Sequence, residues 1–173
     1  DESLFGSQKA KGTAPVAPPG ASIVSVHELR KIRDQIKLHN TNIENYANLV
    51  KIILKIKPTE IYHLAAQSYV GYSFEDEFST LNININGTHY LLSAVKEFAA
   101  NKVKFYFAGS SEMFGKVKAI PQNENTIFNP RSAYGISKVT GYHLVKNYRE
   151  AYKLHASTGI LFNHESPRRG FEF

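Results

Sequence analysis

The stretch Val103-Lys-Phe-Tyr-Phe-Ala-Gly-Ser-Ser-Glu112 begins as an apolar run and ends in polar side chains. The run from Val103 to Ala108 predicts a buried strand, because it is short, aromatic-rich and followed by a glycine. This strand would carry Ser110, Ser111 and Glu112 to its C-terminal end. In an open α/β sheet, ligands bind at that end. The stretch therefore predicts both a central strand and a candidate site.

A second stretch, Tyr134-Gly-Ile-Ser-Lys138, opens the helical pattern that follows. Residues four apart on a helix lie on one face, so the ammonium of Lys138 can favour the phenolate of Tyr134 and lower its pKa. Tyr142 and Lys146 repeat the spacing on the same helix. Eight residues rotate a helix by about 80° beyond two turns, so the two tyrosines cannot face one pocket. We expect Tyr134 to be functional and Tyr142 to pack.

The remaining patterns alternate strands with helices. They predict strands over 36–43, 60–66, 103–108 and 156–162, and helices over 46–56, 79–100 and 133–154. Asn45 is the expected N-cap of the first helix, and Pro58 marks its end. Strands that alternate with crossover helices predict an α/β fold with a doubly wound parallel sheet.

Composition excludes several classes of protein. The chain has no cysteine, which rules out disulfides and thiolate metal sites, and its histidines show no paired ligand spacing, so we expect no metal. No apolar run is long enough to span a membrane, and we expect a cytoplasmic protein. The net charge of +6 invites a nucleic-acid hypothesis. The cations are spread along the chain rather than clustered, so we expect no nucleic-acid partner.

These motifs resemble a known family. Ser110, Tyr134 and Lys138 match the short-chain dehydrogenase/reductase pattern, and Glu112 narrows the match to sugar-nucleotide 4,6-dehydratases. The segments 57–68, 147–152 and 159–170 resemble the GDP-mannose 4,6-dehydratase family in particular. The resemblance runs in order from about Ile36 to Gly170. It implies a Rossmann-like fold and an NADP-dependent hydro-lyase that acts on GDP-mannose in GDP-fucose biosynthesis.

The resemblance also implies roles for the residues already singled out. Tyr134 would take the proton of the sugar 4-hydroxyl during oxidation at C4, assisted by Ser110 and Lys138. Glu112 would then remove the C5 proton, water would leave C6, and the cofactor would return its hydride to C6. The overall reaction is a dehydration without net redox change.

Other positions match family residues that hold ligands. For the substrate these are Ser111 and Asn163. For the cofactor they are Asn42, Ile43, Leu64, Ala65, Ala66, Gln67, Ser68, Ser79, Tyr134, Lys138, His164 and Arg169. Two of these depart from the family, which has aspartate where this chain has Asn42 and tyrosine where it has Ser79. Ser110 stands where the family usually has threonine, which keeps the hydroxyl.

The sequence shows no glycine-rich turn of the Gly-x-Gly type that binds a dinucleotide pyrophosphate. Residues 1–34 contain a stretch rich in proline, glycine and alanine that can bury little surface, so we expect them to form a poorly ordered tail. Residues 35–173 would form a partial NAD(P)-binding domain, so that the Rossmann-like sheet is incomplete and the chain is the central part of an enzyme. The family implies a homo-oligomer, a dimer or tetramer, for a full-length protein.

Two alternatives stay open. One is another nucleotide-sugar dehydratase or epimerase of the same superfamily, against which Glu112 and the segment 163–169 argue. The other is a non-catalytic Rossmann-like interaction module, which the missing glycine turn favours.

Overall fold

A computed structural model describes residues 35–100 and 102–164 of the 173-residue chain. The predicted tail over 1–34 lies outside the described residues. In chain order the elements are α2 (Tyr46–Ile56), β1 (Glu60–His63), α3 (Tyr72–Glu75), α4 (Glu77–Leu81), the π-helical turn η2 (Asn82–Asn86), α5 (Gly87–Ala99), β2 (Lys104–Ser110), the 3-10 turn η3 (Ser111–Met113), α6 (Ala133–Tyr152) and β3 (His155–Leu161).

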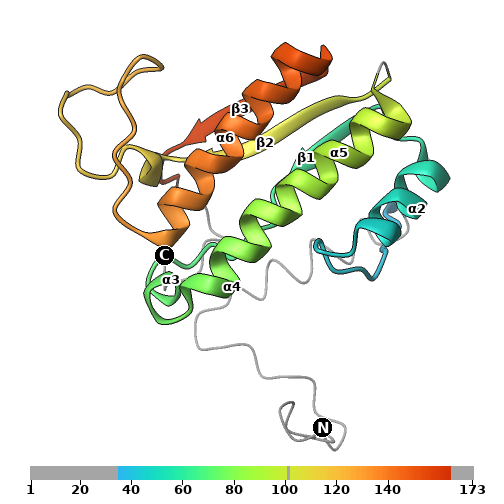
Figure 1. The fold of residues 1–173 in the computed structure, drawn as a ribbon, viewed down its shortest axis with the longest axis horizontal. Helices are drawn as coiled ribbons and strands as arrows, with labels where there is room; N and C mark the ends of the chain where they lie inside the picture. The colour runs from blue at the N-terminus through green and yellow to red at the C-terminus, as the bar shows by residue number, and fades with distance from the viewer. Residues whose placement is uncertain (1–34, 101, 165–173) are drawn as a thin grey trace, which may run out of the picture. The chain divides into compact units, whose positions relative to one another are not determined.

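The described strands form one parallel sheet in the order β1-β2-β3. His63 pairs with Phe107, and Ser110 pairs with Leu161. Helices α4 and α5 with η2 connect β1 to β2, and α6 connects β2 to β3 (Figure 1). The C-terminal ends of all three strands therefore lie along one edge of the sheet, as the sequence predicts.

The strand predicted over 36–43 is wrong, because the structure has no strand there. A parallel strand needs a neighbour to pair with, and among the described residues β1 pairs only with β2. The end of the segment forms a turn instead. The side-chain oxygen of Asn42 accepts from the Glu44 amide at 2.9 Å, and its carbonyl accepts from the Asn45 amide at 3.0 Å.

Helix α2 has the predicted bounds. The side chain of Asn45 caps its N-terminus by accepting from the Asn48 amide at 3.1 Å. Lys57 ends the helix in the left-handed conformation with φ 51°, and Pro58 follows. A proline cannot continue the helical hydrogen bonding, so the sequence determines both ends.

The helix predicted over 79–100 begins earlier and is not uniform. Asp76 caps α4 by accepting from the Ser79 amide at 3.0 Å, so the helix starts at Glu77. It then widens into the π-helical turn η2 before α5 continues to Ala99. Such wide turns are rare and occur often at functional sites.

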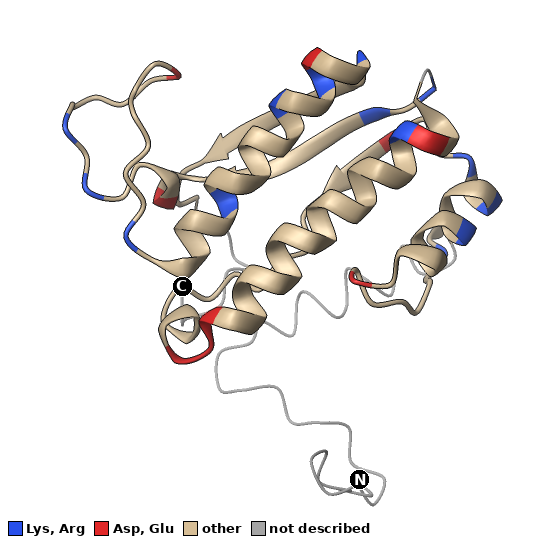
Figure 2. Cartoon of the chain, viewed as in Figure 1, with Lys and Arg blue, Asp and Glu red and all other residues tan. Residues whose placement is uncertain are grey.

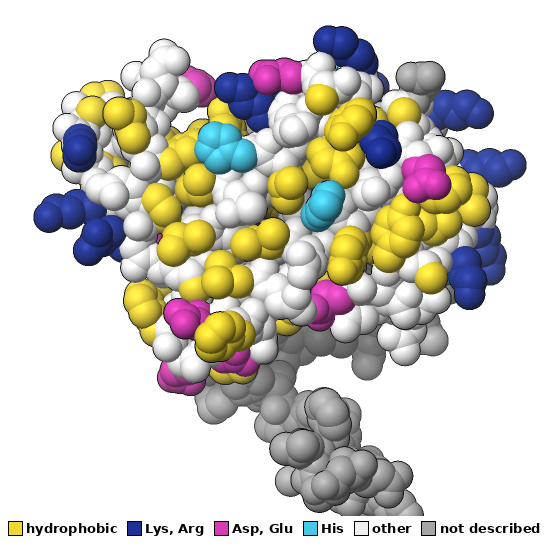
Figure 3. All heavy atoms as spheres, in the orientation of Figure 1, with side chains coloured by type: hydrophobic (Ala, Val, Ile, Leu, Met, Phe, Trp, Pro, Cys, Tyr) yellow, Lys and Arg dark blue, Asp and Glu magenta, His cyan; other side chains and the backbone are white. Residues whose placement is uncertain are grey.

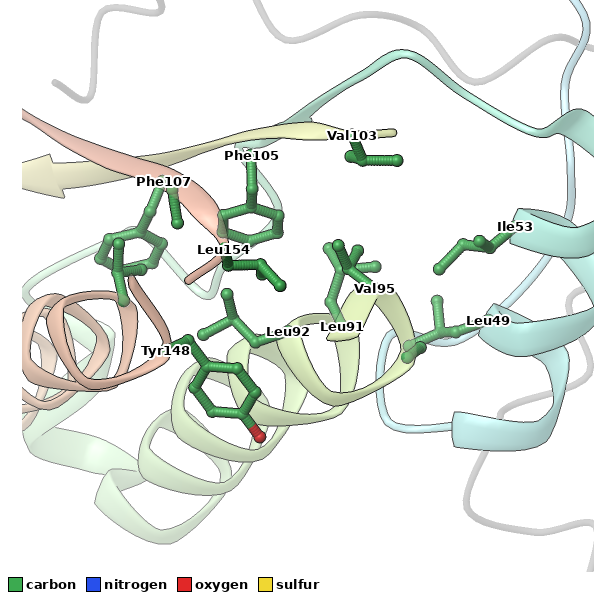
Figure 4. Close-up of a cluster of buried hydrophobic side chains, with 13 residues drawn as sticks. Leu49, Ile53, Leu91, Leu92, Val95, Val103, Phe105, Phe107, Tyr148 and Leu154 are labelled. Atoms are coloured by element: carbon green, nitrogen blue, oxygen red, sulfur yellow. The ribbon is translucent and has the colours of Figure 1, made fainter. Parts of the chain in front are cut away.

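The core lies between the sheet and the helices. Phe105 and Phe107 project from one face of β2 towards Leu92 of α5 and Tyr148 of α6, and Val103 precedes the strand in the same cluster (Figure 4). Leu49 and Ile53 of α2 extend the same cluster. Gly141 of α6 lies so close to the Phe107 ring that a side chain there would clash, which lets the helix approach the central strand.

Helices cover one face of the sheet in the described part of the chain (Figures 1 and 4). On the other face, the rings of Tyr62 and Tyr106 lie with their centres 5.9 Å apart, and Tyr62 is largely exposed. Within 35–100 and 102–164, no helix has the length and hydropathy needed to cross a bilayer.

Candidate active site

Strand β2 delivers the first candidate groups to the edge of the sheet. Ser110 is its last residue, and the buried hydroxyl accepts from the Glu112 amide at 3.2 Å, which caps the turn η3. That turn exposes the Glu112 side chain to solvent. The carbonyl of Glu112 lies against Gly135, so any side chain at this glycine would clash. The site-bearing turn and the start of α6 are therefore packed directly together.

Helix α6 brings Tyr134 and Lys138 to the same place. The Ser132 side chain caps the helix by accepting from the Gly135 amide at 3.0 Å, which places Tyr134 in the first turn. Tyr134 is 9% exposed and Lys138 4% exposed. The Lys138 ammonium donates to the Ala108 carbonyl at 2.8 Å and lies 5.6 Å from the centre of the Tyr134 ring. The structure thus brings together the four residues predicted to be catalytic.

The pKa of Tyr134 differs from the prediction that Lys138 would lower it. The pKa of Tyr134 is raised above its ordinary value of 10.0, mainly by burial and further by the charge of Glu112. A hydrogen bond with Ser110 opposes this shift, because it lowers the pKa. Burial also lowers the pKa of Lys138 to about 8. Both shifts arise because a charge is costly away from water. The lysine therefore does not bring the phenol below its ordinary pKa in this structure, and Ser110 is the group that favours the phenolate.

Behind Tyr134 and Lys138 lies a group of buried polar residues that sequence reasoning missed: His63, Asn84, Thr88 and Ser137. The Thr88 hydroxyl donates to the Asn84 carbonyl at 2.6 Å, so its oxygen must accept from Nε2 of His63 at 2.9 Å. The repeated asparagines of the run Asn82-Ile-Asn-Ile-Asn86 were the one available signal, since asparagine is uncommon inside helices.

His63 gives the fold a predictable response to acid. Burial, and secondarily the charge of Lys138, lowers its pKa from 6.5 to about 4. Between these values the unfolded chain binds a proton that the folded chain does not, so stability is lost as pH falls from 6.5 to 4. A shift of this size corresponds to a loss of about 3 kcal/mol.

We expect urea denaturation of the complete protein to show this loss between pH 7 and pH 4. In His63→Gln, which cannot titrate, the dependence on pH should be flatter by that amount. The exposed His143→Gln is the control and should keep the wild-type slope. Equal slopes in all three proteins would contradict the assignment.

The segment after β1 lies beside these groups. Leu64 is 65% exposed although it is apolar, and Ala65 and Ser68 are exposed as well. Ala66 and Gln67 are half-buried, and the side-chain oxygen Oε1 of Gln67 is buried without a hydrogen-bond partner. The segment after β1 therefore presents an exposed apolar side chain with small neighbours and one unpaired hydrogen-bond acceptor.

Three further cofactor candidates have structural contacts of their own. The Asn42 side chain is engaged in its local turn. The half-buried Ile43 packs against Gly87, where any side chain would clash. Ser79 lies in the first turn of α4, beside the exposed Phe78.

The chain that follows β3 carries the remaining candidates. Asn163 and His164 are exposed, and a ring nitrogen of His164 lies 2.9 Å from the Phe162 carbonyl. Ser111 is half-buried in η3. Because Ser110 pairs with Leu161, Asn163 follows the strand end next to Ser110. Arg169 lies outside the described residues.

Tyr142 packs as predicted. Its ring packs edge-on against the Phe128 ring, with the two ring centres 5.0 Å apart. It also lines a cavity of about 480 Å³ between α6, β3 and the chain after η3, together with Phe114, Lys146, Arg149 and Phe162. Neither Tyr134 nor Lys138 lines this cavity. In the described ranges, no cluster of three or more histidine, aspartate or glutamate side chains could hold a metal ion.

Comparison with known proteins identifies relatives. A family model described as GDP-mannose 4,6 dehydratase matches residues 21–173. The GDP-mannose 4,6 dehydratase of Homo sapiens is 52% identical over 143 residues, which is 82% of this chain and 38% of that protein. The GDP-mannose 4,6-dehydratase of Vibrio cholerae is 46% identical over 137 residues, which is 79% of this chain and 37% of the length of that protein. The chain thus spans less than half the length of these relatives.

Solved structures show the same architecture. RMD from Pseudomonas aeruginosa complexed with NADPH has a TM-score of 0.72 at 26% identity, covering 90% of this chain and 55% of its own. UDP-glucose 4-epimerase from Brucella ovis in complex with NAD has a TM-score of 0.66 at 25% identity, covering 80% and 48%. These likenesses confirm the predicted fold class, a Rossmann-like α/β fold of which the described sheet is part.

Proposed function

The chain belongs to the GDP-mannose 4,6-dehydratase family, and from this premise we propose that the complete protein converts GDP-mannose into GDP-4-dehydro-6-deoxy-mannose. The observation that carries the proposal is the meeting of Ser110, Glu112, Tyr134 and Lys138 at one edge of the sheet. A phenol, a hydroxyl, a cation and a carboxylate there are the groups that two successive proton removals require.

Each residue has a role that follows from its position. Tyr134, in its phenolate form, accepts the proton of the sugar 4-hydroxyl, and the Ser110 hydrogen bond favours that phenolate before the proton is transferred. With a pKa of about 8, Lys138 is mostly charged at pH 7, and its ammonium is fixed by the Ala108 carbonyl beside the Tyr134 ring. Glu112 is exposed at the turn and removes the C5 proton, which the neighbouring ketone acidifies.

We take the cofactor to be NADP and assign its binding to the segment from Leu64 to Ser68, together with Asn42, Ile43, Ser79, His164 and Arg169. The unpaired Oε1 of Gln67 supports this placement, because it needs a donor. The chemistry that a bound nicotinamide dinucleotide supplies is reversible acceptance of hydride, taken from C4 and returned to C6. Ser111 and Asn163 face the sugar in this proposal.

The distribution of side chains on the surface bears on partners. Figure 2 shows Lys and Arg on α2, on α6 and on the loop before α6, without one dominant basic face in that view. Figure 3 shows apolar side chains over α5 and α6, where Phe98, Ile136 and Tyr152 are each at least two-fifths exposed. We propose that a second copy of the protein covers this face, in keeping with the homo-oligomer that the sequence predicts.

The test is a product assay on the complete protein. Incubation with GDP-mannose and NADP should give a nucleotide sugar that has lost one water and gained a 4-keto group, detected by mass spectrometry, with no net reduction of the cofactor. NAD in place of NADP should support a slower reaction. An epimerised hexose of unchanged mass would favour the epimerase alternative, and no conversion of any nucleotide sugar would favour the interaction module.

A further inference from the structure

Glu112 lies on a short turn, whereas the other candidate catalytic groups belong to longer elements. Ser110 ends the seven-residue strand β2, and Tyr134 and Lys138 lie on the 20-residue helix α6. The turn η3 has three residues, and its start is fixed by the Ser110 hydroxyl, which accepts from the Glu112 amide. The Glu112 side chain itself is exposed. Its position therefore depends on the contacts that hold the end of the turn.

Asn129 returns the chain to the end of this turn, after a loop over 117–128 that extends away from the sheet (Figure 1). Its amide donates to the Met113 carbonyl at 3.1 Å, and its carbonyl accepts from the Lys116 amide at 3.1 Å. Its side-chain nitrogen Nδ2 donates to the Lys116 carbonyl at 2.8 Å. These three hydrogen bonds, which we call the loop clamp, close the loop at its base and attach that base to η3.

Close packing surrounds the loop clamp. Gly115 has a left-handed φ of 51°, and a side chain there would clash with the Asn129 carbonyl, so the chain can pass the clamp only at a glycine. Phe114 is buried, and its ring centre lies 5.4 Å from that of Phe128. Met113 is buried as well. The end of η3 is therefore enclosed, and the loop clamp holds it by the Met113 carbonyl.

We propose that Asn129 is a positioning residue for Glu112, because the loop clamp fixes the end of the turn that carries this carboxylate. The inference rests on the proposed function, in which Glu112 removes the C5 proton. A general base must lie within hydrogen-bonding distance of the proton that it takes, and a small displacement is costly in rate. Tyr134 is held independently, by the Ser132 cap and the hydrogen bonds of α6. Loss of the Asn129 side chain should therefore slow elimination and spare oxidation.

The test compares Asn129→Ala and Asn129→Leu with the wild type in the complete protein. Both variants lack the Nδ2 donor, and leucine keeps the approximate size of the side chain. Stopped-flow absorbance of the reduced nicotinamide reports both steps, since it rises on oxidation at C4 and decays when hydride returns to C6 after water has left. In both variants the rise should stay within about twofold of wild type, and the decay should slow about tenfold, the rate equivalent of one lost hydrogen bond. Incorporation of solvent deuterium at C5 should slow by the same factor.

Gln122→Ala is the matched control. The Gln122 side chain donates to the Ala119 carbonyl at 2.8 Å, a bond of the same kind and length within the same loop but outside the loop clamp. This variant should keep the wild-type rise and decay. Equal slowing of rise and decay in the Asn129 variants would mean that Asn129 supports the whole site, and a wild-type decay in Asn129→Leu would mean that the hydrogen bond is not needed. Either result would overturn the proposal, as would an equal slowing of the decay in Gln122→Ala.

Amide hydrogen exchange provides a readout that does not depend on turnover. Asn129→Ala should speed exchange about tenfold at the amides of Phe114, Lys116 and residue 129, and it should leave the first turns of α6 unchanged. Gln122→Ala should change neither region. Faster exchange in α6 as well, or no faster exchange around η3, would contradict a local clamp. If the wild-type protein does not convert GDP-mannose, the proposed function fails, and this measurement alone decides whether Asn129 fixes the turn.

Discussion

Replacing Tyr134 with phenylalanine is expected to lower the rate of oxidation at C4 by about 10²–10⁴-fold, the usual contribution of a general base. The substitution removes the hydroxyl and keeps the ring that packs at the start of α6. Tyr134 is buried beside Ser110 and Lys138, and its raised pKa means that few molecules carry a phenolate before the substrate binds. Only the phenolate can accept the proton of the sugar 4-hydroxyl, and phenylalanine cannot form one, which makes the hydroxyl indispensable.

Tyr142→Phe is the matched control, because Tyr142 belongs to the same helix and has the same Tyr-x-x-x-Lys spacing. It packs on Phe128 and faces the cavity beside β3, away from Tyr134. Stopped-flow absorbance of the reduced nicotinamide measures the oxidation step in the complete protein. The Tyr142 variant should retain the wild-type rate. If both variants lost the step equally while circular dichroism showed intact folding, the assignment of Tyr134 would have no basis.

The sequence predicted the elements whose signals are local. Asn45 and Pro58 define the ends of α2 because a cap and a proline act within a few residues. The apolar run from Val103 predicted the central strand, and the structure extends it to Ser110, which pairs with Leu161. The meeting of Ser110, Glu112, Tyr134 and Lys138 follows from parallel topology, because strand ends and helix starts share one edge of the sheet.

What the sequence did not reveal depends on contacts between distant segments. A strand over 36–43 fits the local pattern, but strand formation requires a neighbour, and the segment turns back at Asn42 instead. The expected lowering of the Tyr134 pKa considered the lysine charge and not burial, which raises the pKa. The hydrogen bond from the Asn84 side chain to the Ser137 hydroxyl joins residues that are 53 positions apart, so no local pattern indicates it.

Glu112→Gln is expected to separate oxidation from elimination, and the elimination should fall by about 10²–10⁴-fold, the cost of losing a general base. The amide keeps the size of the side chain and the cap of η3, which uses the backbone amide of residue 112 and not its carboxylate. Tyr134 and Lys138 remain, so oxidation at C4 should persist. The loss of the charge near Tyr134 should also lower the pKa of that phenol, since Glu112 raises it in the wild type.

Solvent deuterium makes the separation measurable in the complete protein. A base that removes the C5 proton exchanges it with water, so the wild type should place deuterium in the 6-deoxy-4-keto product, whereas Glu112→Gln should accumulate an oxidised sugar without deuterium at C5. Glu124→Gln, on the loop that follows η3, is the control and should behave as wild type. A Glu112→Gln variant that still forms a deuterated 6-deoxy product at the wild-type rate would assign removal of the C5 proton to another group. Loss of oxidation and elimination together would instead mean that Glu112 acts at C4 beside Tyr134. This is the specific alternative, because the charge of Glu112 already influences the pKa of that phenol.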